Sequence, residues 1–397
     1  MLNRDYNNCM KILYLNNLLN GGAANSIRMV AKGAIEKGHT PVLIVSADSS
    51  STSIVDGYTV HHVKTPNLYG IVGTRNQAKW KKPIWHLLDS YNIFSKHSLK
   101  KIILAEKPDI IHTNNYSGFS PYIWKLADKL GIPVVHTIQD YSLVCTRAIM
   151  FKNSLCLKQC AACKLYSIPK KHLSRYVQAV VGVSNIILQT HLKLGFFKHA
   201  SIKTNIHNPI SLTIHTLNKT TQTPLKFGFV GLLAPIKGTD CLLEVFSKHF
   251  KSGATLHLWG KGYTSEFENM IKEKYKQENI IFEGYGNHDE IYKKVDVLIV
   301  PAMWHEPFGL IIPEANSFGV PVIASQRGAF TETVTDGKNG FLFNPDQPES
   351  LVEKIQYFID HPEIISSMET NCLAFAKTCS YETISNQYLE IYKQILN

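Results

Sequence analysis

The feature that most constrains the fold of this chain is an alternation of apolar runs and a helical pattern between residues 294 and 343. Residues 297–301 are apolar and long enough for a buried strand of a parallel sheet. A loop follows, and residues 309–316 then have the pattern of a helix. A second apolar run occupies residues 320–324. This order predicts a strand–loop–helix–strand unit of an α/β protein with a doubly wound parallel sheet.

Two carboxylates stand at the two ends of the loop and helix, Glu306 and Glu314. The backbone N–H groups of Phe308, Gly309 and Leu310 are expected to point out of the helix start, where they favour a phosphate or a developing negative charge. Glu314 lies further along the helix, where a carboxylate suits vicinal hydroxyls such as those of ribose. These features predict a site for a nucleotide-sugar. The alternative is that both glutamates are solvated charges beside a helix.

The same stretch resembles the donor site of the retaining nucleotide-sugar glycosyltransferases of the GT-B fold, the group 1 family. The family motif E-P-F-G-x-x-x-x-E begins at Glu306 and ends at Glu314, and residues 319–325 read GVPVIAS behind it. The resemblance is close in the second half of the chain and loose in the first half. It implies two Rossmann-like, doubly wound α/β domains that face each other across a cleft. It also implies a hexosyltransferase that acts with retention at the anomeric carbon and without a catalytic metal.

The resemblance assigns roles to individual residues. Glu306 would orient the donor sugar, and Lys237, in a loop that matches the family's x-P-x-K-G pattern, would neutralise the leaving diphosphate. Glu314 would bind the ribose, and His136 would contact the donor sugar from the end of a strand. A surface lysine and a partly buried strand-end histidine are the alternatives for Lys237 and His136. Further donor-binding positions implied by the resemblance are Gly21, Gly22, Gly231, Phe308, Gly309, Leu310 and Glu332.

One position departs from the family pattern, because Leu232 stands where the family often has an arginine. Donor binding would then depend more on Lys237 and on backbone amides. Leu232 therefore keeps open a catalytically weakened nucleotide-sugar-binding protein. A GT-B nucleotide-sugar epimerase is a second alternative. A glycogen-phosphorylase-like enzyme is disfavoured, since no lysine of the second domain has a cofactor-anchoring motif.

The length of 397 residues suits two domains. We place the first domain at residues 1–210 and a polar, threonine-rich linker at residues 211–224. The nucleotide-sugar-binding domain would then span residues 225–378. The resemblance implies that a last helix, in residues 379–397, returns to the first domain.

In the first domain the apolar runs predict strands, and residues 66–97 have little apolar rhythm. The expected strands are residues 11–15, 41–46, 58–63, 109–112, 133–137 and 179–184, the last of which would end the domain. Residues 66–97 mix basic and aromatic side chains, which suits a membrane interface or a glycan acceptor. Nucleic acid is disfavoured as a partner, since no nucleic-acid-binding motif occurs.

Four cysteines fall within a short lysine-rich segment that we expect to be a loop, namely Cys145, Cys156, Cys160 and Cys163. The C-x3-C and C-x2-C spacings are compatible with a structural zinc site. Free thiols in a loop are the alternative. No catalytic cofactor is expected, and the eight scattered cysteines do not form a pattern typical of a disulfide framework.

The charge of the chain is unevenly distributed. Residues 1–210 hold 26 Lys and Arg against 9 Asp and Glu, a net of +17, whereas the remainder has a net of −6. A basic first half suggests an anionic partner such as a membrane surface or a pyrophosphate-linked lipid, although a lysine-rich surface also simply confers solubility. Without a signal peptide or a transmembrane run of about 18 apolar residues, we expect a cytoplasmic location, with peripheral binding at the inner face of the membrane.

These expectations combine into one prediction for the partners of the chain. The donor would be a nucleotide-diphosphate sugar, and the acceptor would be a glycan or a lipid-linked saccharide. By family frequency and the basic first half, the expected pathway is bacterial surface-polysaccharide synthesis, including lipopolysaccharide. The base and sugar of the donor and the linkage formed are left open.

Overall fold

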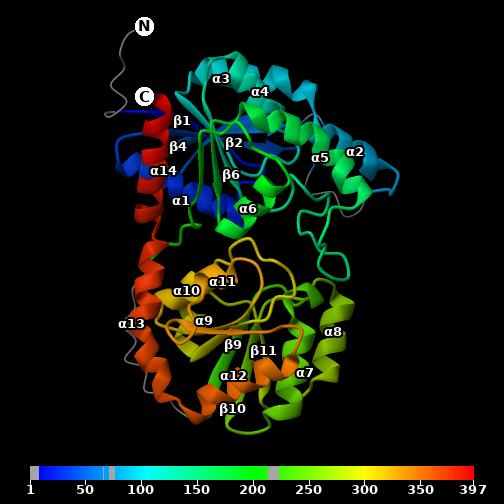
Figure 1. Ribbon diagram of the computed structural model, residues 1–397, viewed down its shortest axis with the longest axis vertical. Coiled ribbons are helices and arrows are strands. Elements are labelled where there is room, and N and C mark those ends of the chain that lie inside the picture. The colour runs from blue at the N-terminus through cyan, green and yellow to red at the C-terminus, as the bar shows by residue number, and fades with distance from the viewer. Residues whose placement is uncertain (1–8, 66, 71–76, 213–222) are drawn as a thin grey trace. The chain divides into compact units, whose positions relative to one another are not determined.

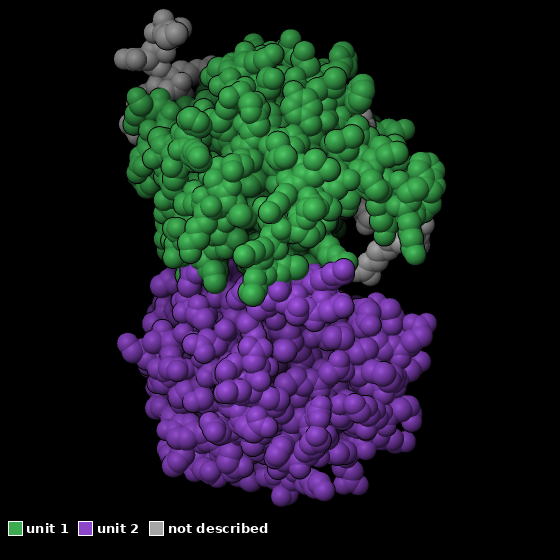
Figure 2. Space-filling model, turned by 45° about the vertical axis from the view of Figure 1, so that its right-hand side comes forward, with its two compact units in different colours: residues 1–150, 156–209, 381–397 green, residues 151–155, 210–380 purple. Residues whose placement is uncertain are grey.

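The structure is a computed structural model that describes residues 9–65, 67–70, 77–212 and 223–397 (Figure 1). The chain forms two compact units, which Figure 2 shows in different colours. Unit 1 comprises Met1–Met150, Cys156–Pro209 and Tyr381–Asn397, and unit 2 comprises Phe151–Leu155 and Ile210–Ser380. Each unit contains its own sheet with its own helices, and each is described by itself.

The sheet of unit 1 has eight strands in the order β3-β4-β2-β1-β5-β6-β7-β8, all parallel except β3. The strands are β1 (Lys11–Leu15), β2 (Thr40–Ala47), β3 (Ser51–Val55), β4 (Tyr58–Lys64), β5 (Ile110–Thr113), β6 (Val134–Ile138), β7 (Ala179–Gly182) and β8 (Ile202–Asn205). The side chains of β5, β6 and β7 are all buried, as is typical of parallel strands covered on both faces. β2 and β5 lie on opposite sides of β1, so the strand order reverses at β1 and β5.

Nine helical segments accompany this sheet among the described residues of unit 1. They are α1 (Gly22–Glu36), α2 (Lys81–Ser90), η2 (Ile93–Ser95), α3 (Lys96–Glu106), α4 (Tyr122–Lys129), α5 (Ala161–Leu173), η3 (Ser174–Tyr176), α6 (Asn185–Lys193) and α14 (Tyr381–Leu396). α14 packs tightly on α1, since a Cβ atom at Gly33 would overlap the side chain of Ser385. Tyr388 and Tyr392 of α14 belong to the apolar core of unit 1. The end of the chain is therefore part of this core.

The sheet of unit 2 has six parallel strands in the order β11-β10-β9-β12-β13-β14. The strands are β9 (Leu225–Val230), β10 (Ala254–Trp259), β11 (Ile280–Gly284), β12 (Val297–Val300), β13 (Val322–Ser325) and β14 (Gly340–Phe343). The helices are η4 (Pro235–Lys237), α7 (Thr239–His249), α8 (Ser265–Lys274), α9 (His288–Lys294), α10 (Ile311–Ser317), α11 (Phe330–Thr333), α12 (Pro348–Asp360) and α13 (Glu363–Thr378). β10 and β12 lie on opposite sides of β9, so this sheet changes direction between β9 and β12.

The doubly wound α/β class predicted from the sequence is confirmed, but several elements differ. β3, β8 and β14 were not predicted, and β8 rather than residues 179–184 ends the first sheet. β3 is a mostly exposed edge strand that pairs antiparallel with β4, so it lacks the apolar run that marks a central strand. The segment predicted to be irregular contains α2. Most of the predicted linker, and residues 66 and 71–76 of the irregular segment, lie outside the described residues.

Within the described residues, no helix combines the length and the apolar composition needed to cross a lipid bilayer.

Candidate functional site

The point where the sheet of unit 2 changes direction brings two predicted catalytic residues together. Lys237 lies in η4, after β9, and Glu306 lies in the loop after β12. The Lys237 Nζ donates a hydrogen bond to Glu306 Oε2 at 2.7 Å. In open α/β sheets, ligands bind at the carboxyl ends of the strands beside such a point. An ammonium with one of its three N–H groups used by Glu306 can still bind an anionic ligand.

A close approach of two backbone segments holds Lys237 in this place. Gly238 ends η4 with a positive φ of 74°. A Cβ atom at this position would overlap the carbonyl oxygen of Pro301, which directly follows β12. Only glycine allows this approach, which explains why Gly238 follows Lys237 in the sequence.

The loop that carries Glu306 is clamped by the segment after β13. The carbonyl oxygen of Glu306 accepts from the backbone N–H of Ala329 at 2.9 Å, and His305 Nδ1 accepts from that of Gly328 at 3.1 Å. Burial, with a smaller effect of Arg327, lowers the pKa of His305 and so keeps its ring in the neutral form that can accept this bond. The sequence analysis gave no role to His305 or Gly328, because nothing local connects residues 23 positions apart.

Two adjoining pockets of unit 2 lie at this edge of the sheet, and the narrower one contains the ion pair. A narrow pocket of about 60 Å³ is lined by Lys237, Glu306 and Gly309 among others. A wider one of about 330 Å³ is lined by side chains including Trp259 and Tyr285, and Val230 and Gly231 line both pockets. A small charged site thus adjoins a wider aromatic one.

The wider pocket lies at the carboxyl ends of β9, β10 and β11. Tyr285 is 75% exposed, and Lys261 Nζ lies 5.0 Å from the centre of its ring. A flat ligand ring could stack on such a side chain. The sequence analysis did not identify Tyr285. The glycine that ends β11, directly before Tyr285, could have pointed to it.

Glu314 lies on α10 and is contacted from α9. The Tyr292 hydroxyl donates to Glu314 Oε2 at 3.3 Å, and His288 Nδ1 lies 3.9 Å from Glu314 Oε1. Burial raises the pKa of Glu314, whereas His288 and Tyr292 act in the opposite direction. The carboxylate is thus oriented before any ligand binds.

The predicted start of this helix needs a correction. α10 begins at Ile311, two residues after the predicted start, because Gly309 has a positive φ of 83°, outside the helical region. Phe308 is buried and Leu310 caps the helix. The amides of Phe308 and Gly309 therefore belong to the loop rather than to a first helical turn.

The remaining predicted donor residues lie on both units. Gly231 lines both pockets described above, and Glu332 lies half-buried on α11. Leu232 follows Gly231 and is 42% exposed. Gly21 and Gly22 form the start of α1 in unit 1, where a Cβ atom on Gly21 would meet no other atom within 4 Å.

His136 lies in the core of unit 1. Its Nδ1 is 2.9 Å from Thr113 Oγ1, and its ring stacks on Phe197 with 5.6 Å between the ring centres. Only 2% of the residue is exposed, and burial holds the pKa of its ring well below the usual range. This environment is that of the strand-end alternative, so direct contact of His136 with the donor sugar stays a prediction.

The cysteine segment also differs from the predicted loop, because α5 begins directly after Cys160. Cys145 and Cys163 are buried, whereas Cys160 is exposed. In the part of the chain that the structure describes, no three His, Cys, Asp or Glu side chains are grouped so as to hold a metal ion. Structural zinc at these cysteines stays a prediction.

Two family descriptions match consecutive parts of the chain. "Glycosyltransferase Family 4" matches residues 20–213, and "Glycosyl transferases group 1" matches residues 213–372. Among curated proteins, the chain is 30% identical over 377 residues to an "Uncharacterized 42.6 kDa protein in cps region" of Klebsiella pneumoniae, covering 94% of this chain and 96% of the relative. It is 26% identical to an uncharacterized glycosyltransferase of Methanocaldococcus jannaschii, over 83% of this chain and 96% of that one.

Solved structures match both units at once. Sucrose-phosphate synthase from Thermosynechococcus elongatus has a TM-score of 0.75 and 18% identity, with 97% of this chain and 99% of that chain covered. Anabaena HepE in complex with UDP and glucose has a TM-score of 0.69, also at 18% identity and with the same coverage. Identities this low establish similarity of fold alone.

Proposed function

Because the chain belongs to the group 1 glycosyltransferases and has the GT-B fold, we propose that it transfers a hexose from a nucleotide-diphosphate sugar, with retention at the anomeric carbon. The observation that carries this proposal is the ion pair of Lys237 and Glu306, which lies beside an aromatic pocket where the sheet of unit 2 changes direction. A charged site next to an aromatic one suits a diphosphate joined to a nucleoside.

Catalysis in this proposal is mainly electrostatic and positional. Lys237 and the backbone around Gly309 neutralise the diphosphate as the bond to the sugar breaks. Glu306 orients the sugar and stabilises the positive charge that develops at its ring. No covalent intermediate with the protein is needed, since a phosphate oxygen of the leaving group can take the proton of the acceptor hydroxyl.

The wider pocket and α10 would hold the nucleoside. A base stacked on Tyr285 would place the ribose hydroxyls toward Glu314, whose oxygens are oriented by Tyr292 and His288. UDP is the first nucleotide to test, since the structurally similar HepE was crystallised with it. Gly231, Leu310 and Glu332 complete the proposed donor site in unit 2, with Gly21, Gly22 and His136 as its proposed contributors in unit 1.

For the acceptor, we propose a glycan or lipid-linked saccharide of surface-polysaccharide synthesis. The relative from a cps region of Klebsiella pneumoniae supports this proposal. The net charge of +17 in residues 1–210 supports reaction at the cytoplasmic face of a membrane.

The test begins with thermal unfolding of the protein in the presence of UDP, GDP, ADP and their hexose derivatives. A ligand that binds only the folded state stabilises it by about 2.7 kcal/mol at a hundredfold excess over its Kd. The nucleotide that stabilises the protein then identifies the sugars to use in a transfer assay. Failure of every nucleotide to stabilise the protein would contradict the proposal.

Glu306→Gln then tests the catalytic site. We expect transfer to fall by about 10²- to 10³-fold, because an oriented charge next to the reacting sugar is lost. Glu244→Gln is the matched control, since it removes one carboxylate from the exposed ion pair with Lys248 on α7. Wild-type turnover by Glu306→Gln, with the fold intact, would remove Glu306 from the mechanism.

The exposed Leu232 favours one second candidate, a nucleotide-sugar-binding protein with weak catalysis. Such a protein would bind a nucleotide without turnover, and Leu232→Arg would raise its affinity. An epimerase, by contrast, would change the sugar of the donor without any acceptor present.

A further inference from the structure

A pocket of about 390 Å³ in unit 1 has no role in the donor site. Its lining includes Asn17, Asn115 and Asp140, which follow β1, β5 and β6 respectively. The strand order of this sheet reverses at β1 and β5, so the pocket lies at the carboxyl ends of the strands, beside the reversal. This is the place where open α/β sheets bind ligands.

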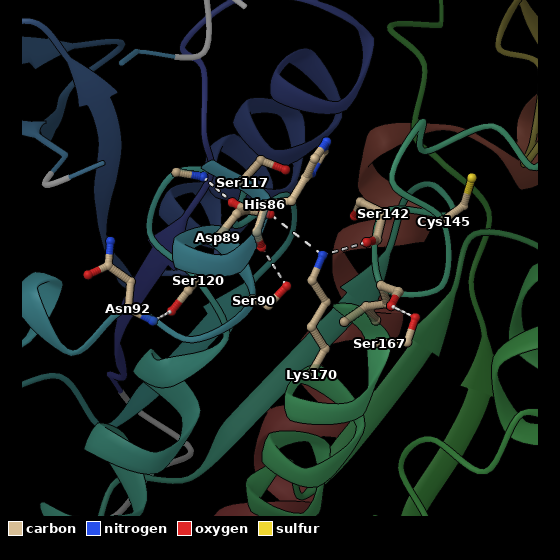
Figure 3. Close-up of polar contacts among 12 residues, drawn as sticks. His86, Asp89, Ser90, Asn92, Ser117, Ser120, Ser142, Cys145, Ser167 and Lys170 are labelled. Carbon is tan, nitrogen blue, oxygen red and sulfur yellow. Dashed lines mark hydrogen bonds and ion pairs between the residues drawn. The ribbon is translucent and has the colours of Figure 1, made fainter. Parts of the chain in front are cut away.

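A buried ion pair forms part of the pocket wall (Figure 3). Lys170 of α5 and Asp89 of α2 are only 5% and 3% exposed, and Lys170 Nζ lies 3.5 Å from Asp89 Oδ2. Lys170 also donates to the carbonyl oxygen of Ser142 at 2.8 Å, and Asp89 accepts from the backbone N–H of Gly118 at 2.7 Å. Asp89 therefore balances the charge of this ammonium, and Lys170 keeps a further N–H group that can donate to a ligand in the pocket.

The pocket lining contains three cationic side chains, Lys82, Arg147 and Lys170, against two carboxylates, Asp89 and Asp140. Asp140 already accepts from the backbone N–H of Ser142 at 2.8 Å and from Asn115 Nδ2 at 3.2 Å. Lys82 and Arg147 line the pocket and are exposed, and neither side chain has an acidic partner among the described residues. The pocket therefore favours a ligand that carries an anionic group.

The rest of the lining suits a sugar ring. Trp85 stacks on Tyr69 with 5.8 Å between ring centres, and His86 meets the Trp85 ring edge-on at 5.2 Å. Burial lowers the pKa of His86, which keeps this side chain neutral. Tyr69 is half-buried and can contact the apolar face of a sugar, whereas Trp85 is only 8% exposed and packs behind Tyr69. The amide of Asn115 and the carboxylate of Asp140 can bind the sugar hydroxyls.

From these observations we infer that the pocket binds a phosphorylated saccharide as the acceptor, with its sugar ring near Tyr69, Asn115 and Asp140 and its phosphate near Lys82, Arg147 and Lys170. The identification as acceptor rests on the function proposed above, whereas the binding chemistry rests on unit 1 alone. The same chemistry is present in a free sugar phosphate and in the headgroup of a prenyl-diphosphate-linked sugar.

Isothermal titration calorimetry of the full chain tests this inference with glucose, galactose and mannose 1-phosphates. UDP is present in excess, so that the proposed donor site is occupied, and the methyl glycosides of the same sugars serve as neutral probes. We expect at least one hexose 1-phosphate to bind and its methyl glycoside to bind more weakly. Lys82→Ala/Arg147→Ala should weaken that binding by roughly 10- to 100-fold, because two charge-assisted contacts are lost.

Lys101→Ala/Lys164→Ala is the matched control, since it removes the same charge from exposed positions of α3 and α5 outside the pocket. This control should bind the hexose phosphate and UDP like the wild type. Equal binding by the two double variants, or equal affinity for the neutral glycoside, would overturn the inference.

The two proposals fail in different ways. Binding of UDP without binding of any hexose 1-phosphate overturns the pocket inference and leaves the proposed function standing. If the protein does not bind UDP but binds a hexose 1-phosphate, and Lys82→Ala/Arg147→Ala weakens that binding, the pocket inference stands and the proposed function is overturned.

A prenyl-diphosphate-linked hexose in detergent micelles distinguishes a lipid headgroup from a free sugar phosphate as the ligand. Tighter binding than the free hexose phosphate identifies the lipid headgroup, and equal binding identifies the free saccharide, both of which support the phosphate site.

Discussion

At the scale of single residues, Glu314 lowers the stability of the folded protein at neutral pH and has a proposed role in ligand binding. Burial raises its pKa, so the folded protein binds this proton more tightly than the unfolded chain does. The contribution of Glu314 to stability is therefore present at low pH and is lost as the pH rises through the raised pKa. At neutral pH the ionised carboxylate opposes folding, although Tyr292 and His288 offset part of this effect.

We accordingly expect Glu314→Gln to unfold at a higher temperature than the wild type near pH 8, with the difference disappearing below about pH 4. The same change should weaken binding of the nucleotide diphosphate by about tenfold or more, since an ionised acceptor is lost. Thermal unfolding across this pH range and calorimetry with the nucleotide check both parts. Glu353→Gln, at an exposed position of α12, is the control. A lower unfolding temperature at pH 8 together with unchanged binding would contradict both roles.

The cysteines around the start of α5 provide a second prediction at this scale. Backbone and thiol hydrogen bonds from Cys163 lower the pKa of Cys160, whereas burial raises that of Cys163 to about 11. In protein treated with a chelator, iodoacetamide should therefore modify Cys160 first and Cys163 late, as mass spectrometry can measure. If Cys160 resists iodoacetamide in untreated protein and reacts only after the chelator is added, the result would indicate the predicted zinc site. Equal rates with and without chelator would rule that site out.

Site residues could be predicted from the sequence where they belong to one continuous motif. Glu306 and Glu314 are the first and last residues of a nine-residue motif. Their partners could not be predicted, because the Tyr292 bond to Glu314 and the Lys170 contact with Asp89 depend on how separate helices pack. His136 was placed on the correct strand, but its burial depends on Trp124 and Phe197, which come from elsewhere in the chain.

At the scale of secondary structure, apolar runs predicted the buried strands and missed the strands with polar faces. β12 has an unbroken apolar sequence and was predicted, whereas β8 alternates half-buried and exposed residues and was missed. α5 was missed because Pro169 and several lysines interrupt its apolar rhythm, and tertiary packing against α2 and the Cys145 loop supports it instead. Elements at the sheet edges thus need tertiary information that the sequence pattern lacks.

The contact between η4 and β12 gives a prediction for an element. Gly238→Ala should displace η4, and with it Lys237, because the new methyl group would overlap the carbonyl oxygen of Pro301. Nucleotide affinity should fall by about tenfold or more, as a charge-assisted contact of Lys237 is lost. Gly337→Ala is the control, since Gly337 has a similar φ of 73° but no atom within 4 Å of the added Cβ. That control should lose only about 1–2 kcal/mol of stability and bind nucleotide normally. Equal nucleotide affinity in both variants would show that the close approach does not position Lys237.

At the scale of the whole molecule, the two units have separate sheets and different proposed binding roles. The narrow pocket of unit 2 is lined by Lys237 and Glu306 and adjoins the wider one, whereas the pocket of unit 1 is lined by Lys82 and Arg147, which have no acidic partner among the described residues. The net charge is divided in a similar way, with +17 in residues 1–210, which contain most of unit 1, and −6 in the remainder, which contains most of unit 2. Attraction of the chain to an anionic surface should therefore depend on which half supplies the charge, and not on the total of +11 alone.

Sedimentation with phospholipid vesicles tests this division. The full chain should bind vesicles that contain about one-third anionic lipid, since each basic residue near such a surface contributes about 1 kcal/mol. Binding should be lost on neutral vesicles and in about 1 M salt, where the Debye length is only about 3 Å. Changing three exposed lysines of unit 1 to glutamate, Lys158, Lys164 and Lys198, should abolish binding. The same change at Lys248, Lys272 and Lys293 of unit 2 alters the total charge equally, but most of the vesicle binding should remain. If the two triple variants bind alike, the total charge governs the attraction and the basic half does not direct the protein to a membrane.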